Sequence, residues 1–271
     1  AQAQLWGYVN ESEFVNEAMD IESDAQGNSY VTGYITGETS FGVSVSFPSA
    51  QGNGDIYVAK YTSNGALIWV KKFGGNFSDR GYDLALDNSG NIFVTGQFYG
   101  TVDFDGQSVS SNSNSKDIFL IKMTNTGSVL WAISEGGSGA ENAYGVTCDG
   151  SGNVIITGQY EGNGVLVNQN FSSTLDPITG LASYDLFVSK YDGKGNNALF
   201  ITGDFKGNLI YSNNGNSQQT ISNYSRSIFV LNTTLAGGKN WVNTIGSEND
   251  ISARSISVDS NNDAFVTGYF T

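Results

Sequence analysis

Three short phrases recur along this chain at fixed intervals, and this repetition constrains the fold more than any other feature of the sequence. The first phrase is Asp-x-x-Gly-Asn followed by an apolar pair and Thr-Gly, as in "DNSGNIFVTGQ" from Asp87. The second is an Asp followed by apolar residues and a Lys, as in "DIFLIKM" from Asp117. The third is a Gly-bearing turn that leads to a Trp, as in "TGSVLW" ending at Trp131. Repetition on this scale predicts one supersecondary unit stacked several times.

The repeated residues are assigned structural roles, the Asp in turns and the Trp in strands. Asp side chains in turns commonly cap backbone N–H groups, so we expect the Asp of the first phrase to cap the backbone of its own turn. The segment "GALIW", which contains Trp69, is similar to docking motifs of quinoprotein dehydrogenases, in which the Trp stabilises packing between blades, so we expect a packing role for the repeated Trp. These residues are Asp24, Asp87, Asp149 and Asp259 for the turns, and Trp6, Trp69, Trp131 and Trp241 for the strands.

The intervals between the phrases are constant, with one exception. The second phrase and the Thr-Gly strand that follows it lie 36 residues apart, as from Leu120 to Ile156. The corresponding positions Val188 and Ile201 are only 13 residues apart, which is 23 fewer. Losing that length would remove a Trp strand and the strand after it, and would leave buried backbone groups unpaired. We therefore predict that about 23 residues of the natural protein are absent from this sequence near residues 195–197.

Each unit, such as the interval from Val94 to Ile156, contains four runs typical of β-strands. Tight Gly-bearing turns join the first run to the second and the third to the fourth, and a longer polar connection joins the second to the third. Four antiparallel strands per unit predict a blade of an all-β propeller. Abundant glycine, 35 residues, and only 2 prolines fit many short strands joined by turns. In the second unit the runs are residues 82–87, 92–98, 117–123 and 128–133.

We predict a single propeller domain over residues 1–271, in which five blades begin. Residues 1–8 are a candidate closing strand for the last blade, because pairing the two termini removes exposed sheet edges. The last unit lacks its third strand, so we expect the intact propeller to have five to seven blades. The predicted blades are residues 9–72, 73–133, 134–195, 196–243 and 244–271.

These phrases resemble the secreted bacterial β-propeller repeat known as the SBBP repeat. The resemblance rests on Asp-x-x-Gly-Asn-x-x-Val-Thr-Gly, on Asp-aromatic-Val-x-Lys-Tyr, and on Gly-x-x-x-Trp followed by Gly-Gly at 74–75 and 136–137. The Gly-Gly pair is not kept after Trp241. The resemblance implies bacterial export to the medium or the cell surface. Some relatives of this kind carry a C-terminal sorting domain for type IX secretion.

Composition excludes several classes of function. The net charge of −14 would repel a polyanion, so we expect no nucleic-acid partner. No apolar run reaches the length that spans a bilayer. The chain has no histidine, which removes Ser-His-Asp catalysis and ordinary zinc sites. We therefore expect no enzyme and no catalytic residue. A paired-carboxylate glycosidase stays open, with Asp79, Glu141 and Glu248 as its candidates.

Binding is expected on one face of the blades, which we call the long-loop face. It comprises the second-to-third-strand connections, such as 99–116 and 161–184, and the loop after each Trp strand, such as 73–80. Loops on a rigid scaffold commonly carry binding residues. Aromatic side chains there would stack on sugars or anchor a protein, and the alternative is that most pack on blade edges. The candidates are Phe77, Tyr99, Phe104, Tyr160, Phe171, Tyr211 and Tyr224.

No cofactor is expected, and calcium is the alternative that the Asp turns leave open. Calcium takes six to eight oxygen ligands, whereas each turn offers two or three. The segment "DFDG" at 103–106 is read as a turn for the same reason. The sequence thus favours a non-enzymatic secreted or cell-surface module that binds a protein or a glycan. A scaffold subunit of an envelope or secretion assembly, and a glycan hydrolase or lyase, are the alternatives.

Overall fold

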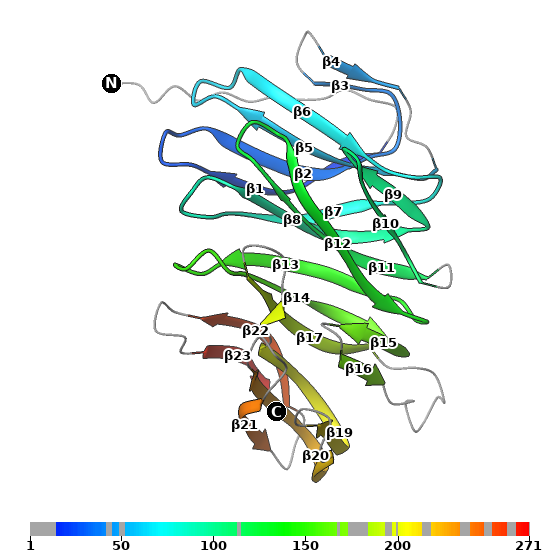
Figure 1. Ribbon diagram of the computed structural model, residues 1–271, viewed down its shortest axis with the longest axis vertical. Helices are drawn as coiled ribbons and strands as arrows, with labels where there is room; N and C mark the ends of the chain where they lie inside the picture. The colour runs from blue at the N-terminus through cyan, green and yellow to red at the C-terminus, as the bar shows by residue number, and fades with distance from the viewer. Residues whose placement is uncertain are drawn as a thin grey trace. The chain divides into compact units, whose positions relative to one another are not determined.

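The computed structural model is built from β-strands, and no helix occurs among the residues that it describes (Figure 1). Side chains are described up to residue 162 within the described ranges, and again for 187–192. The chain divides into two compact units, Ala1–Thr147 (unit 1) and Cys148–Thr271 (unit 2). The described residues are 15–41, 45–48, 52–112, 115–166, 169–172, 184–192, 197–198, 200–212, 218–233, 239–246, 251–258 and 264–270.

Unit 1 contains two four-stranded antiparallel groups that follow chain order. The first is β1 (Asn16–Ser23), β2 (Ser29–Ile35), β5 (Asp55–Tyr61) and β6 (Leu67–Phe73), paired in that order. The second is β7 (Arg80–Leu86), β8 (Ile92–Tyr99), β11 (Lys116–Met123) and β12 (Val129–Gly137), again paired consecutively. These groups confirm the predicted four-stranded blades, and the four expected runs of the second unit match its strands closely. β13 (Asn142–Cys148) begins the next repeat.

Unit 2 continues the same antiparallel pattern. β14 pairs with β17 and β17 with β18, β19 pairs with β20 and β20 with β21, and β22 pairs with β23. The predicted break near 195–197 is not tested, because residues 193–196 lie outside the described residues, so it stays a prediction. The bounds are β14 (Val154–Glu161), β15 (Asn163–Leu166), β16 (Gln169–Ser172), β17 (Tyr184–Tyr191), β18 (Asn197–Ala198), β19 (Phe200–Ser212), β20 (Gln218–Thr233), β21 (Lys239–Gly246), β22 (Ile251–Val258) and β23 (Ala264–Phe270).

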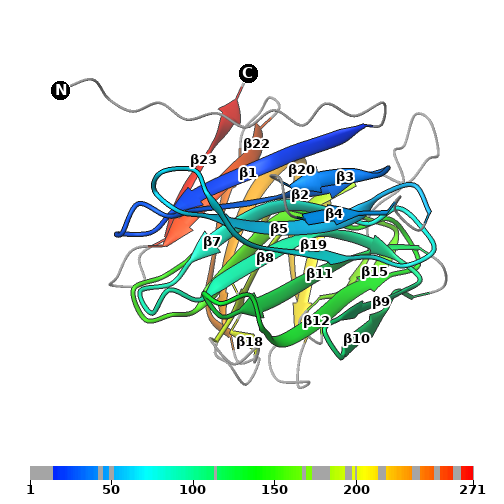
Figure 2. The same cartoon turned by 90° about the horizontal axis from the view of Figure 1, so that it is seen from above.

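The second-to-third-strand connections, which the sequence predicts to be long and polar, contain β-hairpins. β3 (Thr39–Phe41) pairs with β4 (Val45–Phe47), and β9 (Thr101–Phe104) pairs with β10 (Gln107–Ser110). Both hairpins lie at the same end of unit 1 (Figure 2). The β9–β10 turn has positive φ at Asp105 and Gly106, 50° and 90°. Two consecutive residues with positive φ form the tight turn whose twist matches that of the two strands in a two-residue hairpin.

The β9–β10 hairpin corrects one predicted binding residue. The sequence places Phe104 on the long-loop face as an accessible aromatic, but it is 0% exposed. Its ring lies 5.2 Å from that of Phe73 and 5.2 Å from that of Phe119, measured between centroids. The hairpin folds back on the sheets, so the inward side of β9 supplies core residues. Phe104 therefore stabilises the fold and has no surface for a ligand.

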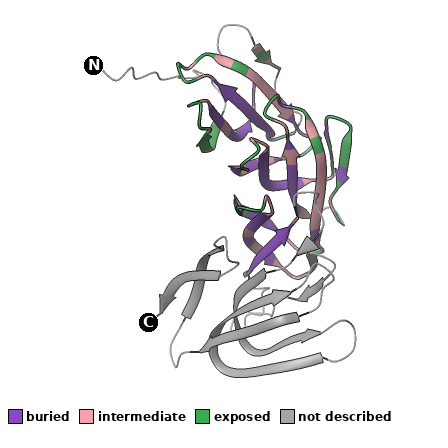
Figure 3. Ribbon diagram, turned by 60° about the vertical axis from the view of Figure 1, so that its left-hand side comes forward, coloured by how far each residue is buried: buried purple, intermediate pink, exposed green. Residues whose placement is uncertain are grey.

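The core of unit 1 lies between its two four-stranded groups, where buried residues concentrate (Figure 3). Ile56 and Val58 of β5 belong to the same buried cluster as Val94 of β8 and Phe119 of β11. Strands that are apolar on both faces are expected where each sheet is covered on two sides. Both faces of β5 are buried along its whole length, which agrees with that expectation.

The Thr-Gly phrase has a specific structural reason. The Thr95 hydroxyl donates a hydrogen bond to the Phe119 carbonyl at 2.7 Å, across from β8 to β11. A Cβ atom on Gly96 would overlap the carbonyl oxygen of Arg80, because β7 has a bulge between Gly81 and Asp83. Glycine at this position thus allows the bulged first strand to approach the second strand closely. Likewise, a Cβ atom on Gly33 would overlap the carbonyl oxygen of Glu17.

The Trp phrase connects one four-stranded group to the next. The Trp69 indole N–H donates to the Asn125 carbonyl at 3.1 Å, in the turn between β11 and β12. The Trp69 ring lies so close to Gly127 that a Cβ there would be 3.1 Å from it. Lys60 also donates to the Asn125 carbonyl, at 3.2 Å. The Trp of one blade therefore packs against the Gly-bearing turn of the next blade.

Candidate functional site

The repeated Asp residues hold their own turns. In the turn after β7, Asp87 Oδ1 accepts backbone N–H bonds from Ser89 and Asn91, both at 2.9 Å, and Oδ2 accepts the Asn91 side-chain amide at 2.7 Å. Burial opposes ionisation of this carboxyl, but the hydrogen bonds from Asn91 and Ser89 outweigh it, and the pKa of Asp87 is lowered. Lys122 lies 3.6 Å from Oδ2. These hydrogen bonds hold the turn in place.

Asp24 and Asp149 repeat this arrangement in the first and third repeats. Each accepts from the backbone two and four residues ahead, and from an Asn side chain at the fourth residue. Asp149 also pairs with Lys190 at 2.7 Å. Asp259 lies outside the described residues. Among the residues with described positions, no group of three or more His, Cys, Asp or Glu is placed to hold a metal ion.

Two of the carboxylates considered for glycosidase chemistry anchor the loops after the Trp strands. Asp79 is 0% exposed, and its two oxygens accept the backbone N–H groups of Tyr99 and Gly75 at 3.0 and 2.7 Å. Glu141 is also buried and accepts the Gly137 N–H at 3.1 Å. Glu248 lies outside the described residues. Burial raises the pKa of Asp79 to about 6 against these hydrogen bonds, and nearby Asp55 adds to the rise.

The sequence carries a signal for these loop anchors outside the three repeated phrases. Asp79 follows Trp69 at the same interval at which Glu141 follows Trp131, and Asn16 follows Trp6 at that interval too. Asn16 Oδ1 accepts the Thr36 N–H at 3.2 Å, as Asp79 accepts that of Tyr99. A polar side chain at this position therefore holds the end of the second strand in both four-stranded groups.

The predicted aromatic binding residues fall into three groups. Phe77 is 52% exposed and Tyr99 is half-buried, so both present accessible surface. Tyr160, at 8% exposed, is buried like Phe104 and is a packing residue. Three more lie in strands whose side chains are not described: Phe171 in β16, Tyr211 in β19 and Tyr224 in β20.

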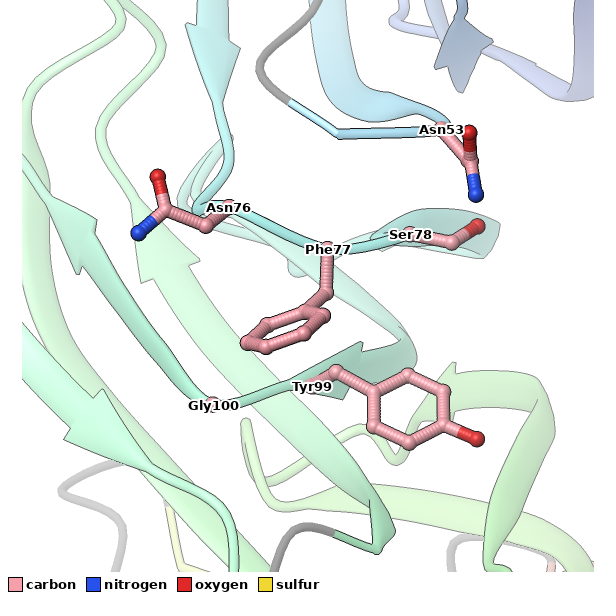
Figure 4. A pocket seen from close by; sticks show the side chains of 6 residues that line it. All are labelled: Asn53, Asn76, Phe77, Ser78, Tyr99 and Gly100. Carbon is pink, nitrogen blue, oxygen red and sulfur yellow. The ribbon is translucent and has the colours of Figure 1, made fainter.

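Phe77 and Tyr99 meet at a pocket of about 240 Å³ on the long-loop face of unit 1 (Figure 4). Their ring centroids are 6.2 Å apart and the ring planes are inclined by 43°. In Figure 4 the two rings lie on the same side of the loop that carries Phe77, and Asn53 and Ser78 lie together at one end. The lining residues are Asn53, Asn76, Phe77, Ser78, Tyr99 and Gly100.

Three backbone constraints fix the walls of this pocket. The Asp79 N–H donates to the Gly54 carbonyl at 2.9 Å, which ties the Phe77 loop to the segment before β5. The Asp79 carboxyl ties the same loop to Tyr99. Gly100 has φ of 67°, and a Cβ there would lie 3.0 Å from the Phe77 ring. The Phe77 ring thus lies against a glycine that leaves room for it, and the pocket is preformed.

The chemistry of the lining is aromatic and neutral. No charged side chain lines the pocket. Within the described part of the chain, the side chains of Asn53, Asn76 and Ser78 form no hydrogen bond to protein. Amide and hydroxyl groups of this kind supply both donors and acceptors. The site can therefore bind an uncharged ligand that has an apolar face and several polar groups.

Comparison with known proteins agrees with this architecture. Residues 68–97 match the family model described as SBBP, beta-propeller repeat. This match covers the Trp strand β6 through most of β8, and it confirms the resemblance drawn from the repeated phrases. The chain therefore carries a β-propeller repeat of this kind, within an all-β fold of four-stranded antiparallel sheets.

A curated relative comes from Acanthamoeba polyphaga mimivirus and is called "Uncharacterized WD repeat-containing protein L264". It is 28% identical over 141 residues, which is 50% of this chain and 10% of that protein. The chain thus spans a small part of the relative's length. This likeness supports a propeller module and assigns no activity. Among the described residues, no helix is long and apolar enough to cross a membrane.

Proposed function

We propose that this chain is a non-enzymatic binding module, secreted or held at the bacterial cell surface, that recognises a protein or a glycan through its long-loop face. The observation that carries the proposal is the pocket that Phe77 and Tyr99 line together with neutral polar side chains. Sequence repetition explains the blades, but it does not explain these two rings. At the corresponding positions the first repeat has Phe14 and Thr36 and the third has Gly139 and Glu161, so neither keeps both aromatic residues. A pair of accessible rings that the repeat does not require favours ligand binding.

A scaffold role is the second candidate, and a different surface favours it. Ile68 on β6 and Leu130 on β12 occupy corresponding positions and are 47% and 48% exposed. Apolar side chains repeated on the fourth strands would suit a protein neighbour in an envelope or secretion assembly. A glycan hydrolase is less well supported, because Asp79 and Glu141 are buried and hold loop backbone.

The binding proposal is tested with labelled protein on bacterial envelopes and on a glycan array, with and without EDTA. Envelopes are treated beforehand with protease, which removes protein partners, or with periodate, which oxidises sugar diols. We expect saturable binding that one of the two treatments abolishes and that EDTA leaves unchanged. Binding to neither envelopes nor array would contradict the proposal. Release of sugar from a bound glycan would instead establish the hydrolase alternative.

A further inference from the structure

The size of the Phe77–Tyr99 pocket limits its occupant. Pockets for drug-sized ligands measure about 300–1,000 Å³. At about 240 Å³, this pocket is below that range and suits a single small ring. It lies open on the surface, because Phe77, Asn53 and Asn76 are exposed. A larger molecule could therefore place one terminal or projecting ring in it and leave the rest outside.

The lining distinguishes among small rings. A charged ring would have no ion-pair partner among the residues that line the pocket. A wholly apolar ring would make no hydrogen bond to the amides of Asn53 and Asn76 or to the hydroxyl of Ser78, which also line the pocket. The lining therefore favours a ligand that combines an apolar face for Phe77 and Tyr99 with neutral hydroxyl or amide groups.

We propose that the Phe77–Tyr99 pocket binds one neutral pyranose ring of a glycan. The C–H bonds on one face of such a sugar carry slight positive charge and meet the negative face of an aromatic ring. Its hydroxyl groups both donate and accept, which matches Asn53, Asn76 and Ser78. This inference rests on the proposed binding function and specifies the ligand class for the same site.

The position of the pocket in the repeat supports this assignment. Phe77 and Tyr99 come from the loop and strand that Asp79 holds together, so the spacing of the rings does not depend on a flexible loop. Preorganised rings bind without the cost of ordering two side chains. The first repeat has Thr36 at the position of Tyr99, and the third has Gly139 at that of Phe77. The fold therefore tolerates small residues at both places.

The test is saturation-transfer NMR of the full chain with a panel of neutral monosaccharides, including hexoses and N-acetylhexosamines. We expect transfer to the ring protons of at least one sugar, with a dissociation constant on the order of 1 mM, typical of a small ligand in an open site. F77G and Y99T carry residues that the repeat itself uses, and each should weaken binding about tenfold while the variant remains folded. I21A, at an exposed position on β1, is the control and should bind as the unaltered chain does.

The outcomes separate this inference from the binding proposal. If no sugar shows transfer while envelope binding persists, the pyranose assignment is wrong and the module has another ligand. If transfer occurs but survives both F77G and Y99T, the sugar binds elsewhere and the assignment is also wrong. Absence of envelope binding, array binding and sugar transfer together would overturn the binding proposal itself.

Discussion

The identity of individual residues in the repeat is explained by the atoms that they contact. Gly74 directly follows β6 and Gly136 lies near the end of β12, and a Cβ on either would overlap the side chain of Asp55 or Asp117 respectively. Both Asp residues are buried at the start of the third strand. The Gly-Gly and Asp-aromatic phrases are therefore two parts of one contact. A residue type that recurs here at fixed spacing therefore marks a steric contact within the blade.

The glycine of the Thr-Gly phrase gives the first prediction. We expect G96A to lower the free energy of unfolding by about 3 kcal/mol, because its Cβ would overlap the Arg80 carbonyl oxygen, which cannot move without the backbone. Urea unfolding followed by circular dichroism measures the change. G150A is the matched control, since a Cβ there meets nothing within 4 Å. It should change stability by less than about 0.5 kcal/mol. Equal effects of the two substitutions would refute the steric explanation.

Asp79 gives the second prediction, which concerns pH. Its pKa is about 6 in the folded chain and 3.8 as an ordinary Asp, chiefly because of burial. Between these values the folded state binds more protons than the unfolded state, so stability falls as the pH rises from about 4 to about 6. Two pKa units correspond to a contribution of at most about 3 kcal/mol.

The substitution D79N isolates this effect. Asn16 shows that an Asn at this position accepts the corresponding backbone N–H. We expect the unaltered chain to lose about 2 kcal/mol of stability relative to D79N between pH 4 and pH 7, by urea unfolding at each pH. Other buried carboxyls, including Asp83 and Asp117, are present in both proteins and cancel in the difference. Parallel stability curves for the two proteins would show that Asp79 does not keep its proton as described.

At the scale of strands and turns, the sequence predicts the strands that recur in every repeat. It does not predict the elements whose sequence differs from one repeat to the next. The four strands of each blade are predictable because apolar runs and Gly-bearing turns recur at equal spacing. The turn at 103–106 is predicted but the two strands of the β9–β10 hairpin are not, although Val102 and Phe104 alternate with polar residues ahead of Asp105-Gly106. That pattern is a hairpin signal. Its polar composition resembles a loop, which is why its inward side is wrongly assigned to the surface.

The pocket is only partly predictable for a related reason. Phe77 and Tyr99 are recognisable as aromatics on the long-loop face. Their proximity depends on Asp79, which joins two segments 20 residues apart by a side-chain hydrogen bond to backbone. Side-chain bonds of this kind leave no apolar periodicity in a sequence. Asn53 comes from a different four-stranded group and reaches the pocket only through the packing of one group on the next.

The contact between Trp69 and the turn that contains Gly127 gives the prediction for packing between elements. Gly127 and Gly90 both have positive φ, 86° and 77°, so alanine strains the backbone similarly at each. Only Gly127 has the Trp69 ring against it, at 3.1 Å from an added Cβ. We expect G127A to destabilise the chain by about 1 kcal/mol more than G90A, measured by urea unfolding. In a W69A background this difference should disappear, which is the double-mutant test of a direct contact. A difference that survives in W69A would locate the strain elsewhere.

At the scale of the whole molecule, the sequence repeats as a series of units, and within unit 1 each four-stranded group completes its neighbour. Trp69 of one group is held by Asn125 and Gly127 of the next. The backbone N–H of Leu84 on β7 donates to Asp20 on β1 at 3.1 Å, and that of Val146 on β13 donates to Asp83 on β7 at 2.6 Å. Stability in such arrays is approximately a sum of unit and interface contributions. A repeat without its fourth strand and the next first strand would lose one interface of this kind.

The shortened interval between Val188 and Ile201 therefore gives the last prediction. Gly195 corresponds to Gly127, and the segment 128–150 is what the second repeat has at the place of the predicted gap. We expect insertion of a copy of residues 128–150 after Gly195 to raise the melting temperature, because it restores a Trp strand and a first strand with their interfaces. A flexible Gly/Ser segment of equal length, inserted at the same place, should lower the melting temperature or leave it unchanged. Differential scanning calorimetry compares the three proteins. If the copied strands stabilise no more than the flexible segment, the interval is a true feature of this chain and the prediction of missing residues is wrong.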